Sequence, residues 1–243
     1  MGEICAMTEA QAVKMQQDYD LAAQGLSMTD FISPRQAMSI EGGTAIIHIS
    51  GALVKSAPPI HEKLGNSTYD TISEEIDAAE AAGVANVVFQ IDSGGGGVTG
   101  LAELSEKISE MNAKTVGFSD GSACSAAYYL MAACEHIHAT HSANVGNIGV
   151  VMRFAADSEN NIKVITNDGA DLKGAGLSGL SESQENFLKS RVDKLGEEFR
   201  IHVEKHRLVN SEVFRAGWYY GQEAIELGLV DSDGTRKQLL KNL

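Results

Sequence analysis

Apolar positions along the chain follow two different periods, one typical of strands and one typical of helices. Short runs rich in β-branched and apolar residues predict strands over 44–50, 86–92, 115–118, 136–139, 148–151 and 163–166. Apolar residues spaced three and four apart predict helices over 8–23, 68–82, 98–112, 125–134 and 181–206, and shorter ones over 211–218 and 222–227. Neither period is present in 27–43 or 56–66, which are expected to be connectors.

Strand and helix alternate through most of the chain, which predicts an α/β fold with a largely parallel sheet. No internal repeat or low-complexity tract divides it, and 243 residues suit one large domain. We expect an N-terminal helix and connector over 1–43, the main α/β domain over 44–231, with helices near its end, and a C-terminal tail over 232–243.

Composition and charge narrow the class of protein. Hydrophobic residues make up 43% and charged residues 21%, as in ordinary globular domains. A net charge of −14 argues against nucleic acid as a partner. No apolar run approaches the roughly 20 residues that span a bilayer, and the N-terminus lacks a signal-peptide core. Three cysteines form no disulfide framework, so a cytoplasmic location is expected.

Four consecutive glycines, Gly94 to Gly97, follow the strand expected over 86–92. Glycine adds no side-chain burial and costs backbone entropy, so the run needs a backbone reason. One interpretation is a tight strand-to-helix turn. The other is a backbone N–H that points into a cleft and serves an oxyanion or a phosphate. The run matches no nucleotide-binding fingerprint.

A serine, Ser125, opens the small, apolar helix expected over 125–134. A serine there lies beside the unpaired N–H groups of the helix, which suits a nucleophile. The alternative is a plain N-cap. Cys124 is a rival nucleophile, although the sequence marks no histidine partner for it.

One lysine, Lys173, lies in a glycine-rich loop, where it is either a general base of lowered pKa or a solvated surface residue. His136, His138 and His141 match no zinc-ligand spacing, so we expect no metal and no cofactor. The aromatic residues of 218–220 favour core or interface over a ligand platform.

Taken in order, these segments resemble a known family. The strand end Ile91-Asp92-Ser93 with its glycines is followed by 123–129, by 139–150, by the lysine loop and by 221–231. This order is similar to the signal peptide peptidase A family of serine peptidases, S49, and most to its phage branch of capsid assembly (prohead) proteases. The resemblance covers about 44–231. It implies a ClpP/crotonase-like spiral of βαβ units and a peptidase domain over that range.

The resemblance also assigns roles. It implies Ser125 as the nucleophile of a Ser/Lys dyad, Lys173 as its general base, and the N–H groups of Gly95 and Ala126 as the oxyanion hole. The chain departs from the family at two positions. It has Gly94 where the family turn has proline. It has Asn147 where the family usually has a serine that orients the lysine, and the Asn147 side-chain oxygen can still accept a bond from Lys173.

Related functions remain open. A ClpP-type peptidase would need a histidine about 25 residues after Ser125, and 149–151 contain none. Crotonase-type acyl-CoA proteins share the fold and the backbone oxyanion hole, but they need no Ser/Lys pair. A non-catalytic shell component is a third alternative, and a soluble bacterial signal-peptide-peptidase-like enzyme a fourth.

The phage branch implies protein substrates, namely scaffold or capsid proteins, whereas the bacterial alternative implies signal peptides. The family resemblance also implies a homo-oligomer, in which Lys173 of one subunit can act as the general base for Ser125 of a neighbour. The expected location is the host cytoplasm or the prohead.

Overall fold

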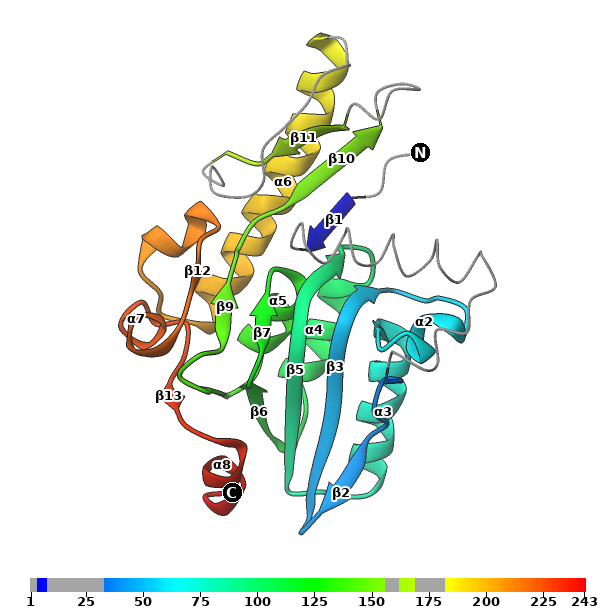
Figure 1. The fold of residues 1–243 in the computed structure, drawn as a ribbon, viewed down its shortest axis with the longest axis vertical. Coiled ribbons are helices and arrows are strands. Elements are labelled where there is room, and N and C mark those ends of the chain that lie inside the picture. The colour runs from blue at the N-terminus through cyan, green and yellow to red at the C-terminus, as the bar shows by residue number, and fades with distance from the viewer. Residues whose placement is uncertain (1–3, 8–32, 156–161, 169–181) are drawn as a thin grey trace.

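The computed structural model describes residues 4–7, 33–155, 162–168 and 182–243 (Figure 1). The helix expected over 8–23 and the loop that carries Lys173 lie outside these ranges. Of the helices within them, none combines the length and the hydropathy needed to cross a membrane.

Parallel strands form the centre of the sheet, as the alternation predicts. β3 (Thr44–Val54), β5 (Asn86–Gly97), β6 (Lys114–Ser119) and β8 (His136–Ala139) lie side by side in that order. The short β13 (Ser232–Asp233) continues the parallel order beyond β8. All four long strands begin within two residues of the predicted positions.

Antiparallel strands at the edges make the sheet mixed. β2 (Ser39–Glu41) pairs with β3, and β10 (Val151–Ala155) pairs with β11 (Ile162–Thr166). β1 (Ile4–Met7), which the sequence analysis missed, pairs antiparallel with both β5 and β10. The strand predicted over 148–151 is wrong in its bounds, because β10 starts only at the last of these residues.

A smaller layer of strands branches from the end of β5. β7 (Ser122–Cys124) pairs in parallel with β5 and with β9 (Asn144–Gly146), and β9 pairs antiparallel with β12 (Trp218–Tyr219). The predicted helix over 211–218 is therefore wrong in its second half. A 3₁₀ turn, Ser211–Arg215, ends at Ala216, whose φ of 61° is left-handed, and the chain then enters β12.

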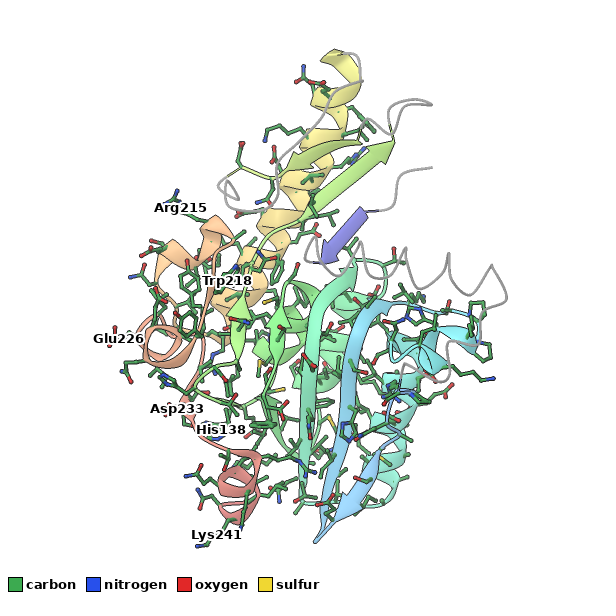
Figure 2. The ribbon with its side chains drawn as sticks, viewed as in Figure 1. His138, Arg215, Trp218, Glu226, Asp233 and Lys241 are labelled. Carbon is green, nitrogen blue, oxygen red and sulfur yellow. The ribbon has the colours of Figure 1, made fainter. Side chains whose placement is uncertain are left out.

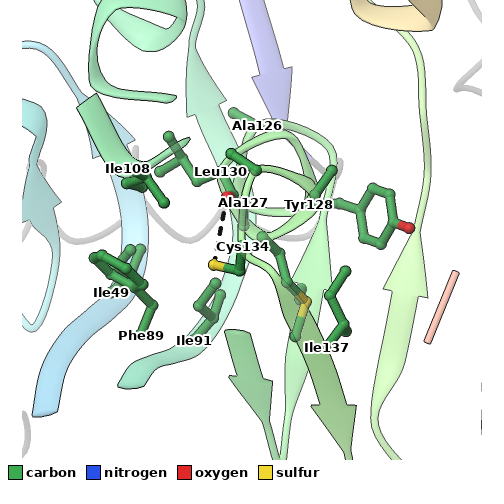
Figure 3. Packing of buried hydrophobic residues seen from close by; sticks show 14 of the residues in the cluster. Ile49, Phe89, Ile91, Ile108, Ala126, Ala127, Tyr128, Leu130, Cys134 and Ile137 are labelled. Atoms are coloured by element: carbon green, nitrogen blue, oxygen red, sulfur yellow. Dashed lines mark hydrogen bonds between the residues drawn. The ribbon is translucent and has the colours of Figure 1, made fainter. Parts of the chain in front are cut away.

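Helices cover the sheet (Figure 1) and close a core of buried side chains, part of which Figure 3 shows. They are α3 (Tyr69–Ala81), α4 (Leu101–Ser109), α5 (Ala126–Ala132) and the long α6 (Glu182–His206). Sheet residues such as Phe89 and Ile91 pack in one buried cluster with Ile108 of α4 and Leu130 of α5. Burial of such side chains is the main stabilising contribution, roughly 1.5–3 kcal/mol each.

The remaining elements are short. α2 (Ile60–Lys63) and β4 (Ser67–Thr68) lie in and just after the stretch expected to be a loop, and α7 (Gly221–Glu226) matches a predicted short helix. α8 (Arg236–Lys241) lies in the segment expected to be a tail. Its Leu239 is buried in a second cluster with Val88 and Phe118, so this segment covers part of the sheet.

Candidate active site

Ser125 lies between the end of β7 and the start of α5, in a strained backbone conformation. Its φ is 58° and its ψ −124°, a region that residues with a Cβ rarely adopt. Such strain costs on the order of 1–3 kcal/mol and persists only where the surroundings enforce it. The Ser125 N–H donates to the Gly146 carbonyl at 2.8 Å, which ties the bend to β9. Strain of this kind is typical of functional sites.

The Ser125 hydroxyl does not cap the helix. Ser125 stands at the N-cap position of α5, yet its side chain makes no capping hydrogen bond. Its Oγ instead donates to the Gly149 carbonyl at 3.4 Å, and the residue is fully buried. The plain N-cap interpretation is therefore wrong. The first N–H groups of a helix have no partner inside the helix, and that of Ala126 is the first.

The glycine run is part of a strand, so the tight-turn interpretation is wrong. β5 continues through Gly97, and a Cβ on Gly96 would lie 1.8 Å from the Leu53 carbonyl oxygen of β3. Glycine is needed there because the two backbones approach so closely. Ser93 braces the run from within, because its Oγ donates to the Gly51 carbonyl at 2.6 Å and accepts the Gly95 N–H at 3.1 Å. For the Gly95 N–H to donate to an oxyanion, it must share or give up its hydrogen bond to Ser93 Oγ.

The strand register places the β5 segment before the glycine run beside the β7 segment before Ser125. Ser93 of β5 lies opposite Ala123 of β7 in a parallel pair. Gly95 follows two residues later within β5, and Ser125 follows two residues later in the bend after β7. The Gly95 φ of 107° turns its peptide in a way that favours glycine. The segments that lead to these two predicted site residues are thus neighbours in the fold.

Asn147 fixes the segment that follows β9. Its N–H donates to the Gly217 carbonyl at 2.6 Å, and its Nδ2 donates to the Ala216 carbonyl at 2.8 Å. Its φ is 51°, a left-handed conformation that asparagine tolerates better than most residues. The side-chain oxygen is thereby turned away from Ala216. Lys173, which the sequence analysis pairs with this oxygen, lies outside the described residues.

One strand, β1, fills the space between the glycine run and β10, and we call this space the slot. The edge of β5 and the edge of β10 do not pair with each other, because β1 lies between them. Cys5 of β1 stands opposite both Gly97 of β5 and Val151 of β10. Since neighbouring strands lie about 4.8 Å apart, the two edges are about two strand spacings apart. Such a slot suits an extended peptide segment.

An apolar pocket adjoins this slot. It has an empty volume of about 360 Å³ and is lined by Val98, Leu101, Ala102, Tyr129, Val150, Leu195, Glu198 and Phe199. Val98 follows the glycine run, Val150 precedes β10, and Tyr129 lies one helical turn after Ser125. The pocket is therefore placed to take a side chain of a peptide held in the slot. Glu198 provides the one carboxylate among the residues that line the pocket.

His202 of α6, which the sequence analysis did not single out, supports the wall of this pocket. Its ring stacks on Tyr129 with a centroid separation of 3.7 Å, and its Nε2 lies 2.9 Å from the Tyr129 carbonyl oxygen. Burial lowers the pKa of His202 to about 4, so the ring is neutral at pH 7. No spacing along the sequence links positions 129 and 202, so only the fold could reveal the pair.

The other candidates lie apart from this arrangement or carry other contacts. Cys124 is buried, with its Sγ 3.7 Å from the Asn144 carbonyl oxygen. His136 and His138 each contact the Ser232 hydroxyl at 2.8 Å, and His141 lies 3.6 Å from Asp233. Of these residues, His138 and Asp233 are labelled in Figure 2. Among the described residues no cluster of His, Cys, Asp and Glu suits a metal ion.

The aromatic residues predicted as core or interface divide between the two environments. Tyr219 is buried, whereas Trp218 and Tyr220 are 58% and 51% exposed, with their rings stacked 6.3 Å apart.

Comparison with known proteins agrees with the resemblance seen in the sequence. The model of Peptidase family S49 matches residues 108–243, more than half of the chain. Capsid assembly protease C of Escherichia phage lambda is 29% identical over 225 residues, which cover 87% of this chain and 51% of that protein. Head-tail preconnector protein GP5 of Enterobacteria phage P21 is 25% identical over 210 residues, with 82% and 42% covered. The chain thus spans about half the length of these relatives.

A solved structure confirms the fold alone. An enoyl-CoA hydratase from Mycobacterium marinum superposes with a TM-score of 0.52 at 15% identity, covering 85% of this chain and 79% of that one. The predicted ClpP/crotonase-like α/β fold is therefore confirmed.

Proposed function

The chain belongs to Peptidase family S49, and on that premise we propose that it is a serine endopeptidase with Ser125 as nucleophile and Lys173 as general base. One observation carries the proposal. Ser125 is buried in a strained conformation, its side chain does not cap α5, and it follows the β7 strand that pairs with β5 just before the glycine run. Strained backbone of this kind clusters at active sites, where the surroundings hold it in place.

The proposed reaction follows from these positions. The neutral amine of Lys173 takes the Ser125 proton, and Oγ attacks the carbonyl carbon of the substrate peptide bond. The N–H groups of Gly95 and Ala126 donate to the oxyanion that forms. The leaving amine receives the proton, and water then hydrolyses the acyl-enzyme. The Asn147 side-chain oxygen orients Lys173 by accepting from its amine.

The proposed substrates are scaffold or capsid proteins in a phage prohead or its host cytoplasm. The similarity to a capsid assembly protease and to a head-tail preconnector protein supports this choice. An extended substrate segment would lie in the slot and place an apolar side chain in the pocket beside Tyr129. A bacterial signal-peptide-peptidase-like enzyme is the alternative that shares the same chemistry.

Active-site labelling tests the dyad. A fluorophosphonate should add one adduct to the wild type, at Ser125, and none to Ser125→Ala or Lys173→Ala. Ser122→Ala is the matched control, since Ser122 is a serine of the adjoining strand β7, and it should label like the wild type. The labelling rate should rise between pH 6 and pH 9 as the lysine loses its proton. A folded wild type that takes no label would favour a non-catalytic shell role or a crotonase-like ligand site.

We also propose that the protein is a homo-oligomer. Whether subunits share the dyad is tested by mixing Ser125→Ala with Lys173→Ala protein. Recovery of labelling in the mixture would mean that Lys173 of one subunit activates Ser125 of another. A mixture as inactive as its parts would place both residues in one subunit.

A further inference from the structure

The slot beside the glycine run is occupied by the chain's own first strand. β1 forms backbone pairs with both walls, Ala6 opposite Gly96 on one side and Ile4 opposite Met152 on the other (Figure 1). In the figure it is the blue arrow between β5 and β10. Both walls are buried, with Val151 and Met152 each 4% exposed and the facing glycines buried as well. The slot is therefore closed to solvent along β1.

The direction of β1 is informative. It runs antiparallel to β5, from the level of Gly97 to that of Gly95, which Met7 faces. A substrate segment that paired with the glycine run in this direction would run past Gly95, whose N–H is a proposed oxyanion donor. β1 and such a segment need the same backbone donors and acceptors, so they cannot bind at the same time.

We infer that the segment Ile4–Met7 is an internal competitor that fills the peptide slot until a substrate displaces it. This inference rests on the proposed peptidase function. Pairing through the backbone makes the slot tolerant of sequence, because a glycine wall offers no side chains for selection. A segment tethered to the same chain is present at an effective concentration of the order of millimolar, so a free peptide must compete against it. With β1 in place, the edges of β5 and β10 are both paired, so neither is exposed to other chains.

A single backbone change separates this role from a merely structural one. Cys5 is the residue that faces both walls, and proline at that position removes an N–H and is disfavoured between two strands. Cys5→Val keeps the N–H and favours strand conformation, so it is the matched control. Hydrogen exchange of peptides covering 95–97 and 151–152 is measured in the Ser125→Ala background, where no self-cleavage interferes.

The expected result is faster exchange of both wall segments in Cys5→Pro than in Cys5→Val, with protection restored by a synthetic peptide of residues 2–9 but not by the same peptide carrying Cys5→Pro. With Ser125 intact, the fluorophosphonate labelling rate of Cys5→Pro should rise about 5- to 100-fold over that of Cys5→Val. The residue 2–9 peptide should reverse the rise.

Two outcomes overturn the inference. Equal exchange of the walls in Cys5→Pro and Cys5→Val would show that β1 does not protect the slot. Equal labelling rates, with Ser125 labelled in both variants, would show that β1 does not limit access, and would leave the peptidase proposal intact. Loss of protection in Cys5→Pro without any labelling of Ser125 in either variant would instead refute the peptidase proposal, and with it the role as a competitor.

Discussion

A methyl group added at Gly96 should damage the fold more than the same group added elsewhere in the sheet. The new Cβ would lie 1.8 Å from the Leu53 carbonyl oxygen, whereas real Cβ atoms essentially never come within 3.0 Å of such an atom. The obstacle is backbone, so β3 and β5 must separate by more than 1 Å. Overpacking costs about 1–3 kcal/mol, and each weakened ladder hydrogen bond about 1 kcal/mol more. We expect Gly96→Ala to lower the free energy of unfolding by roughly 3–5 kcal/mol.

The assay is chemical and thermal denaturation followed by circular dichroism. For a chain of this size, each kcal/mol lowers Tm by about 2–4 °C, so Gly96→Ala should lower Tm by roughly 6–20 °C. Gly117→Ala is the control, because Gly117 also lies in a central strand but its added Cβ would meet the flexible Met131 side chain at 2.7 Å. That variant should lose about 1–2 kcal/mol. Equal losses in the two variants would refute the argument that backbone approach dictates the glycine.

Three further predictions concern polar groups that are largely buried. Arg35 and Glu75 form a bidentate pair whose side chains are only 4% and 12% exposed. Glu75→Gln should therefore lower the free energy of unfolding in urea by about 3–5 kcal/mol, and the double variant Arg35→Met, Glu75→Leu should lower it by less. A larger loss in the double variant would contradict this. The pKa of His202 is about 4 in the folded state and 6.5 in the unfolded state, so between these values the unfolded state binds the extra proton. The free energy of unfolding should therefore fall, by as much as roughly 3 kcal/mol, as the pH drops from 6.5 to 4. His202→Gln should remove this pH dependence, and an unchanged pH dependence would refute the assignment. Asn147→Asp replaces the Nδ2 donor to Ala216 by a carboxylate oxygen. The free energy of unfolding should fall by about 3 kcal/mol at pH 7.5 and by less at pH 4.5, where protonation of the carboxylate restores a donor. The same fall at both pH values would speak against that hydrogen bond.

The parallel core was predictable because its strands are local apolar runs, and its helices are local periodic patterns. β1 was not, since Ile4–Met7 is too short to show a period and its partners lie in Gly95–Gly97 and Val151–Met152. The predicted helix end at 211–218 failed because Ala216 adopts a left-handed conformation that only the pairing with β9 explains.

For the candidate site, the motif resemblance predicted Ser125, Gly95 and Asn147, and these assignments stay predictions. The structure adds that the segments before Ser125 and Gly95 are neighbours, because Ala123 and Ser93 pair. The brace from Ser93 and the support from His202 depend on contacts between distant segments, so no sequence pattern could indicate them.

The hydrogen bonds from Asn147 to Ala216 and Gly217 also set an order of events during synthesis. Ser125 leaves the ribosome long before these partners do, and at roughly 5–20 residues per second the interval lasts several seconds. Until β12 docks against β9, the bend at Ser125 lacks part of the framework that enforces its strained conformation. Ser125, the proposed nucleophile, should therefore reach its strained conformation only after Ala216 and Gly217 have left the ribosome.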